Sequence, residues 1–419
     1  MRRKNIIALI MTLMLTLQLL LSGGCSKVGS FKATDTDGKP LGEAHAEYAE
    51  LALKDAAEIL AKETGLSIKK AEKQLKRGKY NVQTAFDPAV YSALEEAVKS
   101  EEDLGELGCA VTDENGLLVA ILSAEKGNAT TAVKPYGALT PLSVYAPAVE
   151  SGKATYSSVY TDAPLLMVDN QKWPANPNGS YTMKKQTLAT GAAQGLSTVA
   201  ARCLEETDTA EAFLEKLGIA FKPAADNQDA LLKALTDGDD GTALSPVEMA
   251  GYYRLFGNSG RYVVPLTVEV ITDRDGNIIY EGLPEETVIL QDSTTRIVNR
   301  LLVGTTAKGG VAEAAALTDI EVAGTVGSGK EGHWFAGVTP AYSCAVWHDA
   351  TSSENRAPAI FAKALAKLPH TTNSFSSTGD VFQAVFCKES GMLYSKGCTK
   401  MQMGYYTAET RPAPCEGHK

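Results

Sequence analysis

The sequence has few of the residues on which metal centres and nucleic-acid surfaces depend. Only 5 of its 419 residues are histidine, and the 40 Lys and Arg are outnumbered by 50 Asp and Glu, which gives a formal net charge of −10. His333, His348 and His370 are scattered and lack the spacing of metal ligands. We therefore expect no metal and no cofactor, and the acidic balance predicts no binding to nucleic acid.

Long apolar runs are also scarce, apart from one near the N-terminus. Three basic residues precede a mostly apolar run from Ile6 to Leu21, which is short for a membrane span, and small residues then lead to Cys25. This order resembles the lipobox of bacterial lipoproteins, in which the cysteine is diacylated. The alternative is an uncleaved signal anchor. Both interpretations put the body of the protein outside the cytoplasmic membrane, and the first predicts a lipid anchor on its outer face.

The length is sufficient for two or three domains with a full hydrophobic core. A segment rich in Gly, Asp and Lys predicts a flexible tether, apolar residues at helical spacing predict a connector, and a hairpin pattern with a turn at Asp113–Gly116 opens the main domain. The predicted organisation is a signal peptide (1–25), a tether (26–43), a helical connector (44–106), a main domain (107–370) and a cysteine-containing tail (371–419).

The most informative stretch is Pro135–Glu150, which reads PYGALTPLSVYAPAVE. It resembles the start of the nucleophile-bearing helix in the transpeptidase domain of penicillin-binding proteins, where the sequence would be close to PGSTIKPLSVYAPALE. Further runs match landmarks of that family in the same order along the chain. They are Asp162-Ala163-Pro164, Trp173-Pro174-Ala175-Asn176, Ser245–Ala250 and Phe256–Gly260.

The resemblance is to the class A type and extends from about residue 45 to the C-terminus. It implies an α+β fold like that of the serine β-lactamases, with an antiparallel β-sheet flanked by helices, a helical subdomain, and a cleft between them. Class A proteins carry a glycosyltransferase domain before the connector. Such a domain would need roughly two hundred residues, so we expect it to be missing.

Transpeptidases of this family use three motifs. Ser-x-x-Lys supplies a hydroxyl nucleophile and an amine base one helical turn apart, because a serine hydroxyl needs an adjacent base to attack. Ser-x-Asn supplies a proton-relaying hydroxyl and an amide that holds the substrate. Lys-Thr-Gly, on a strand, supplies a second cation and backbone for the oxyanion hole.

In this chain the reactive groups are missing at all three motifs. The equivalent positions are Gly137 and Thr140, then Gly195 and Ser197, then Thr325, Gly327 and Ser328. Losing one member of such a unit costs about a million-fold in rate, and later losses add little. We therefore expect a catalytically inactive member in which Gly327 and Ser328 still contact a peptide carboxylate.

Besides a purely structural lipoprotein that binds no glycan, two functional interpretations remain open from the sequence. The first is an inactive protein of peptidoglycan biogenesis that binds the stem peptide or docks to cell-wall synthesis enzymes. The second is an active D,D-transpeptidase or carboxypeptidase that uses Thr131 and Lys134, a shifted Thr-x-x-Lys pair just before Pro135.

The cysteines fall into two groups. Cys109, Cys203 and Cys344 lie in apolar segments and are expected to be buried thiols. Cys387, Cys398 and Cys415 cluster in the tail, where a disulfide between two of them is expected outside the cytoplasm, with no pairing assigned. A metal site formed by these three and His418 is the alternative.

Overall fold

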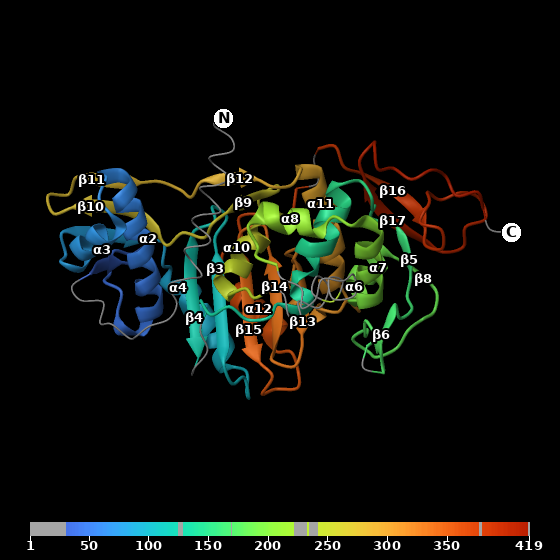
Figure 1. Cartoon of the computed structure of the whole chain (residues 1–419), viewed down its shortest axis with the longest axis horizontal. Helices are drawn as coiled ribbons and strands as arrows, with labels where there is room; N and C mark the ends of the chain where they lie inside the picture. The colour runs from blue at the N-terminus through green and yellow to red at the C-terminus, as the bar shows by residue number, and fades with distance from the viewer. Residues whose placement is uncertain are drawn as a thin grey trace.

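The computed structural model describes residues 31–124, 129–168, 170–221, 233, 242–376 and 379–417 (Figure 1). Cys25, with the signal segment expected before it, and His418 lie outside this range. None of the described helices combines the length and the apolar character that a membrane span requires.

A five-stranded antiparallel sheet forms the centre of the molecule (Figure 1). The hairpin expected from Leu107 is its first element, and Asp113 closes the turn by accepting a hydrogen bond from the amide of Leu117 at 2.8 Å. In spatial order the strands are β13 (Ala323–Ser328), β14 (Gly332–Val338), β15 (Ser343–Asp349), β3 (Leu107–Thr112) and β4 (Leu118–Ala124).

Helices cover both faces of this sheet, so successive side chains of a strand enter different cores. On β14, Trp334 and Ala336 belong to one apolar cluster and Phe335 to the other. The Trp334 face packs against η2 (Tyr136–Leu139) and α10 (Pro246–Gly257), and the Phe335 face against α12 (Ala357–Leu365), which packs in turn on α4 (Pro88–Lys99). The predicted α+β class with a helix-flanked antiparallel sheet is therefore confirmed.

A mostly helical subdomain lies beside the β13 edge of the sheet (Figure 1). Helix α11 (Asp292–Thr306) connects the two parts, because it packs against both β13 and α6. The other elements of this region are η3 (Pro141–Tyr145), α5 (Ala146–Glu150), β5 (Val159–Thr161), β6 (Leu166–Val168), β7 (Gln171–Trp173), β8 (Lys185–Thr187), α6 (Leu188–Gln194), α7 (Ser197–Thr207) and α8 (Ala210–Leu217).

The segment expected to be a helical connector instead shares a sheet with the main domain. Its strand β2 pairs with β10 of the main domain, and helices α2 and α3 cover that sheet with their own apolar cluster. The elements, in sheet order and then the helices, are β1 (Lys32–Thr34), β2 (Tyr80–Thr84), β10 (Val268–Asp273), β11 (Ile278–Glu281), η1 (Glu43–His45), α2 (Ala46–Thr64) and α3 (Ile68–Lys76).

The flexible tether expected over residues 26–43 is wrong for its described part. Lys32–Thr34 forms strand β1, which pairs in parallel with β2, and the middle residue of β1, Ala33, is buried. The Gly- and Asp-rich composition reflects a tight turn rather than disorder: the carboxylate of Asp35 accepts a hydrogen bond from the amide of Lys39 at 2.8 Å.

The cysteine-containing tail forms a hairpin of β16 (Phe382–Cys387) and β17 (Met401–Tyr406) at the end of the molecule opposite α2 and α3 (Figure 1). Cys109, Cys203 and Cys344 are fully buried, as expected. The remaining elements are β9 (Arg261–Val263), β12 (Glu286–Val288) and η4 (Glu313–Ala315).

Candidate functional site

The first-motif segment is a short turn of helix held tightly against the sheet. The indole nitrogen of Trp334 donates to the carbonyl of Lys134 at 2.7 Å, and the hydroxyl of Tyr253 donates to the carbonyl of Ala138 at 2.6 Å. Gly137 and Thr140 therefore have fixed positions. Thr140 is only 8% exposed.

The first and third motifs meet face to face. A Cβ atom on Gly327 would lie 2.4 Å from the carbonyl oxygen of Pro135 and 2.8 Å from the amide nitrogen of Ala138. From the other side, a Cβ on Gly137 would lie 3.0 Å from the carbonyl oxygen of Val326. The predicted proximity of these motifs is thus present, and the packing alone explains why position 327 holds a glycine.

The third motif divides between the two faces of the sheet. Ser328 lies opposite His333 across the hairpin, and its hydroxyl is 3.0 Å from Nδ1 of that ring. Val326, two residues earlier and therefore on the same face, packs into the cluster under α12. Gly327 faces the first-motif turn instead. Gly327 and Ser328 face opposite sides of the sheet, and their joint contact with a peptide carboxylate stays a prediction.

His333 is a partner that the sequence analysis missed. Its Nε2 lies 3.1 Å from the carbonyl oxygen of Ser352, which assigns the proton to Nε2 and leaves Nδ1 to accept the hydrogen bond of the Ser328 hydroxyl. Asn355 also approaches this hydroxyl, at 3.4 Å. Once the register of the β13–β14 hairpin is known, the pairing of Ser328 with His333 across the strands predicts this contact.

The second motif lies at the junction of α6 and α7. Gly195 ends α6 in a left-handed conformation (φ 64°), and Ser197 is the first residue of α7. A Cβ on Gly195 would contact the side chain of Val311 at 3.0 Å. This junction is connected to the sheet through neighbours: α6 packs against α11, which packs against β13.

A buried polar network holds that junction in place, and two of its members, Asp162 and Asn176, come from the landmark runs. Nδ2 of Asn176 and the hydroxyl of Thr198 each donate to Oδ1 of Asp162 at 2.7 Å. The amide of Thr182 donates to the other carboxylate oxygen at 2.7 Å. Asp162 is fully buried, and all of these donors favour its charged form. The landmarks recognised in the sequence are therefore structural supports of the second motif.

The alternative pair has a different geometry from a helical Ser-x-x-Lys. The segment around it is extended, because Val133 forms a β-bridge with Leu244. Thr131 is exposed, and Nζ of Lys134 is 2.9 Å from a carboxylate oxygen of Glu331. Ion pairing stabilises the ammonium form of the lysine, which cannot accept a proton.

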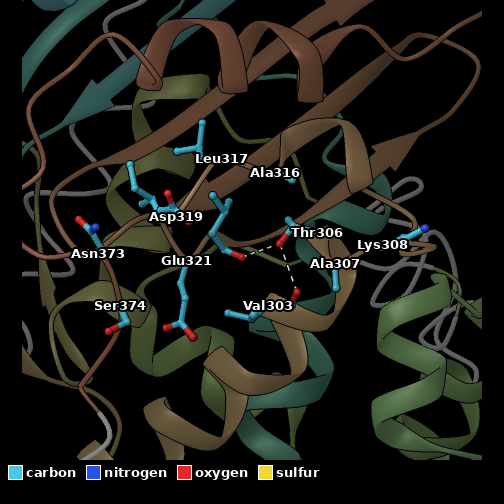
Figure 2. A pocket seen from close by; sticks show the side chains of 12 residues that line it. Val303, Thr306, Ala307, Lys308, Ala316, Leu317, Asp319, Glu321, Asn373 and Ser374 are labelled. Carbon is cyan, nitrogen blue, oxygen red and sulfur yellow. Dashed lines mark hydrogen bonds between the residues drawn. The ribbon is translucent and has the colours of Figure 1, made fainter.

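An open cavity of about 560 Å³ lies at the end of α11 (Figure 2). The hydroxyl of Thr306 is within hydrogen-bond distance of the carbonyls of Val303 (3.2 Å) and Val322 (2.8 Å), and Glu321 and Asn373 reach the same cavity. None of the seven motif positions lines it. Its chemistry is therefore separate from that of the motif-bearing site.

The fold and the order of the motif-equivalent positions are those of a transpeptidase-type domain. A sequence model of the penicillin binding protein transpeptidase domain matches residues 141–366, more than half of the chain. The chain therefore belongs to the penicillin-binding protein transpeptidase family. The match begins at Pro141, so Gly137 and Thr140 lie just outside the matched residues.

Curated relatives include penicillin-binding proteins of Clostridium and Bacillus species. Penicillin-binding protein 1A of Clostridium acetobutylicum is 28% identical over 221 residues, covering 50% of this chain and 27% of the relative. Penicillin-binding protein 1A/1B of Bacillus subtilis is 27% identical over 294 residues, covering 62% of this chain and 31% of the relative. The chain thus spans less than a third of the length of these two relatives.

Solved structures support the same fold. The PonA1 protein of Mycobacterium tuberculosis in complex with penicillin V superposes with a TM-score of 0.63 at 17% identity, over 78% of this chain and 95% of that one. The D,D-transpeptidase domain of a peptidoglycan glycosyltransferase from Eggerthella lenta gives 0.60 at 19% identity, over 69% and 82%.

We predict that Asp162→Asn destabilises the protein by about 1.5–3 kcal/mol, because hydrogen bonds to a buried charged group are lost or weakened. Burial raises the pKa of Asp162, but the hydrogen bonds from Thr198, Thr182 and Asn176 outweigh it, so the pKa lies below its ordinary value. The carboxylate therefore stabilises the fold above about pH 4, and this contribution is lost as the pH falls through the lowered pKa. Denaturant unfolding at pH 7 and pH 3 should show the difference between wild type and variant shrinking at low pH. Asp275→Asn, at an exposed turn, is the matched control; an equal loss there would contradict the assignment.

We also predict that Gly327→Ala costs about 1–3 kcal/mol through overpacking against Pro135 and Ala138. The control is Gly42→Ala, since a Cβ at position 42 meets nothing within 4 Å. Thermal unfolding of both variants measures the effect. A Gly327→Ala protein as stable as the control would mean that the first-motif turn does not pack on β13 as described.

Proposed function

We propose that the protein is a catalytically inactive transpeptidase-like member of the cell-wall machinery. One observation carries the proposal: the turn that would present the nucleophile offers only the backbone of Gly137 to strand β13, and the base position holds the buried Thr140. Acyl transfer to a protein side chain needs a hydroxyl and a group that takes its proton. Gly137 has no hydroxyl, and the hydroxyl of Thr140 is not a base.

The surrounding charges support the proposal. The third motif holds Thr325 where the family has its second cation, and Thr325 is 8% exposed on the sheet. The nearby Lys134 is paired with Glu331. A tetrahedral intermediate at this place would thus lack the cationic stabilisation on which oxyanion chemistry depends.

Within this proposal the protein acts by non-covalent binding, and docking to cell-wall synthesis enzymes is favoured over holding the stem peptide. A peptide carboxylate needs a cation or aligned donors. Thr325 offers no charge, and Ser328 is engaged with His333 on the opposite face. The retained scaffold is then a shaped surface for a protein partner.

The proposed location is the outer face of the cytoplasmic membrane, with the chain anchored by a diacylated Cys25. The support is the sequence alone: a basic start, a short apolar run and small residues before the cysteine. Two acyl chains are sufficient for stable anchoring, whereas one is marginal.

We predict that a fluorescent penicillin forms no stable adduct with the purified full-length chain. Intact mass spectrometry after incubation should show the unmodified mass, because no described group at the motif positions can open the β-lactam ring. An active penicillin-binding protein, labelled in parallel, is the positive control.

An adduct at the mass of the opened β-lactam would overturn the inactive assignment, and variants would then locate the nucleophile. Loss of the adduct in Thr131→Ala or Lys134→Ala would establish the active D,D-transpeptidase or carboxypeptidase alternative. Loss in Ser328→Ala would assign it to the serine–histidine pair.

We predict that purified peptidoglycan sediments no more of this protein than of an unrelated acidic protein of similar size, because the carboxylate-binding groups are missing. Chemical cross-linking in whole cells should instead join it to peptidoglycan synthases. Saturable retention by the purified wall would favour the stem-peptide role over enzyme docking.

A further inference from the structure

The C-terminal hairpin contributes Phe386 and Tyr406 to the main apolar core, whereas its cysteine end has a small cluster of its own. A two-stranded hairpin is marginally stable at best in water, and units below about 40 residues usually need a disulfide, a metal or a partner. The interior of its outer end is not a set of large apolar side chains. It consists of Cys387, Cys398 and Cys415, with Met392 packed against them.

The three sulfur atoms converge on one point. The Sγ atoms of Cys387, Cys398 and Cys415 all lie within 4.8 Å of one another, and the three residues are 0%, 8% and 7% exposed. They come from three separate segments: the end of β16, the loop before β17, and the C-terminal strand-like segment. Convergence from distant positions shows that the chain is folded around this point.

The backbone around the cluster is arranged to present the sulfurs. A turn at Cys387 is closed by hydrogen bonds from its amide to Met392 (2.8 Å) and from the amide of Gly391 back to its carbonyl (2.8 Å). The amide of Cys415 donates to the carbonyl of Leu393 at 2.7 Å. The hydroxyl of Ser395 donates to the carbonyl of Cys415. Each cysteine is thus held by a different part of one connected frame.

A hydroxyl supports the sulfur of Cys415 directly. Ser390 Oγ donates to its Sγ at 3.3 Å. Donors to sulfur in the surrounding shell are typical of sites where the thiolate is a metal ligand. Among the described residues, these three form the one group of three or more His, Cys, Asp or Glu side chains with metal-binding proximity.

We propose that Cys387, Cys398 and Cys415 bind a zinc ion that fastens the C-terminal segment to the β16–β17 hairpin. A zinc–sulfur bond is about 2.3 Å, so tetrahedral ligands lie about 3.8 Å apart. Sulfur atoms that all lie within 4.8 Å of one another are compatible with that spacing. This proposal replaces the sequence-based expectation of no metal. It is independent of whether the domain is catalytic.

Zinc binding displaces a proton from each thiol, so three thiols that enter as thiolates release three protons to the solvent. Three thiolates and one Zn²⁺ carry a net charge of −1, and a neutral fourth ligand leaves that unchanged. The sequence provides one such group close to the cluster, His418, three positions after Cys415 and outside the described residues. Substitution of His418 tests whether it is the fourth zinc ligand.

The arrangement favours a metal over a disulfide. A disulfide brings two sulfurs to about 2.05 Å and leaves the third cysteine out, whereas a metal uses all three. Cys398 contacts both of the other thiols through its side chain. A three-fold cluster with mutual contacts matches the metal geometry, and the disulfide becomes the alternative outcome of the test.

The zinc site would be linked to the helical subdomain through contacts made by its turn and by β17. Ser157, in the helical subdomain, donates its hydroxyl to the carbonyl of Gly391 at 2.6 Å, and a Cβ on Gly391 would lie 2.4 Å from the carbonyl oxygen of Ser157. Tyr156 stacks edge-on against Tyr405 of β17 (5.2 Å between centroids). The turn that carries Cys387 is thus the turn that docks the tail.

The test is the metal content and intact mass of the full-length protein, purified without reducing agent or chelator after growth with added zinc. We expect about one zinc per chain by elemental mass spectrometry, and full thiol mass after denaturation with chelator. Co²⁺ exchanged into the site should give thiolate-to-cobalt charge-transfer absorption. Cys398→Ser should reduce zinc to background and abolish that absorption.

Cys344→Ser is the matched control, since Cys344 is a buried thiol of the central sheet and should leave the zinc content unchanged. His418→Ala decides the fourth ligand: weaker zinc retention against a chelator assigns His418, and unchanged retention assigns another donor such as water. A chain 2 Da lighter without zinc would overturn the proposal in favour of a disulfide. Zinc that persists in Cys398→Ser would overturn it as well.

Discussion

The contact between the first-motif turn and the edge strand of the sheet organises this protein. Pro135 and Ala138 lie against Gly327 so closely that no side chain fits at that position. The turn is held there by Trp334 from the neighbouring strand and by Tyr253 from α10, so sheet and helices meet at one place. In an active transpeptidase such closeness would bring nucleophile and oxyanion donors together; here it is retained with Gly137 in place of a nucleophile. Packing alone is therefore sufficient to preserve this contact, whatever chemistry the domain performs.

A structural rather than a chemical role also explains the landmark residues Asp162 and Asn176. Asp162, Asn176 and Thr198 form a buried hydrogen-bond network around one carboxylate beside the second motif. Removing one partner of such a network leaves a desolvated polar group, which costs more than the hydrogen bond contributes. Selection for a stable fold is then sufficient to keep these residues, whatever the domain binds.

The sequence predicted the parts of the fold that depend on local pattern or on family resemblance. The hairpin at Asp113–Gly116 and the α+β class were both accessible in this way. What it could not predict depends on pairing between distant segments. The contact between Ser328 and His333 follows from their pairing across the β13–β14 hairpin. Lys32–Thr34 forms a strand because it pairs with β2, about fifty residues further along the chain. Spacing along the chain likewise gave no indication that Cys387, Cys398 and Cys415 share one centre.

Strand β1 also limits how far the body of the molecule can be from a membrane. Only six residues separate Cys25 from Lys32, and seven peptide steps span at most about 25 Å when fully extended. A tether up to residue 43 would have allowed more than twice that distance. A lipid on Cys25 would thus hold the α2–α3 end of the molecule within roughly one small-domain diameter of the bilayer surface. Its partners would have to be sought in that layer, because the domain cannot search the depth of the wall.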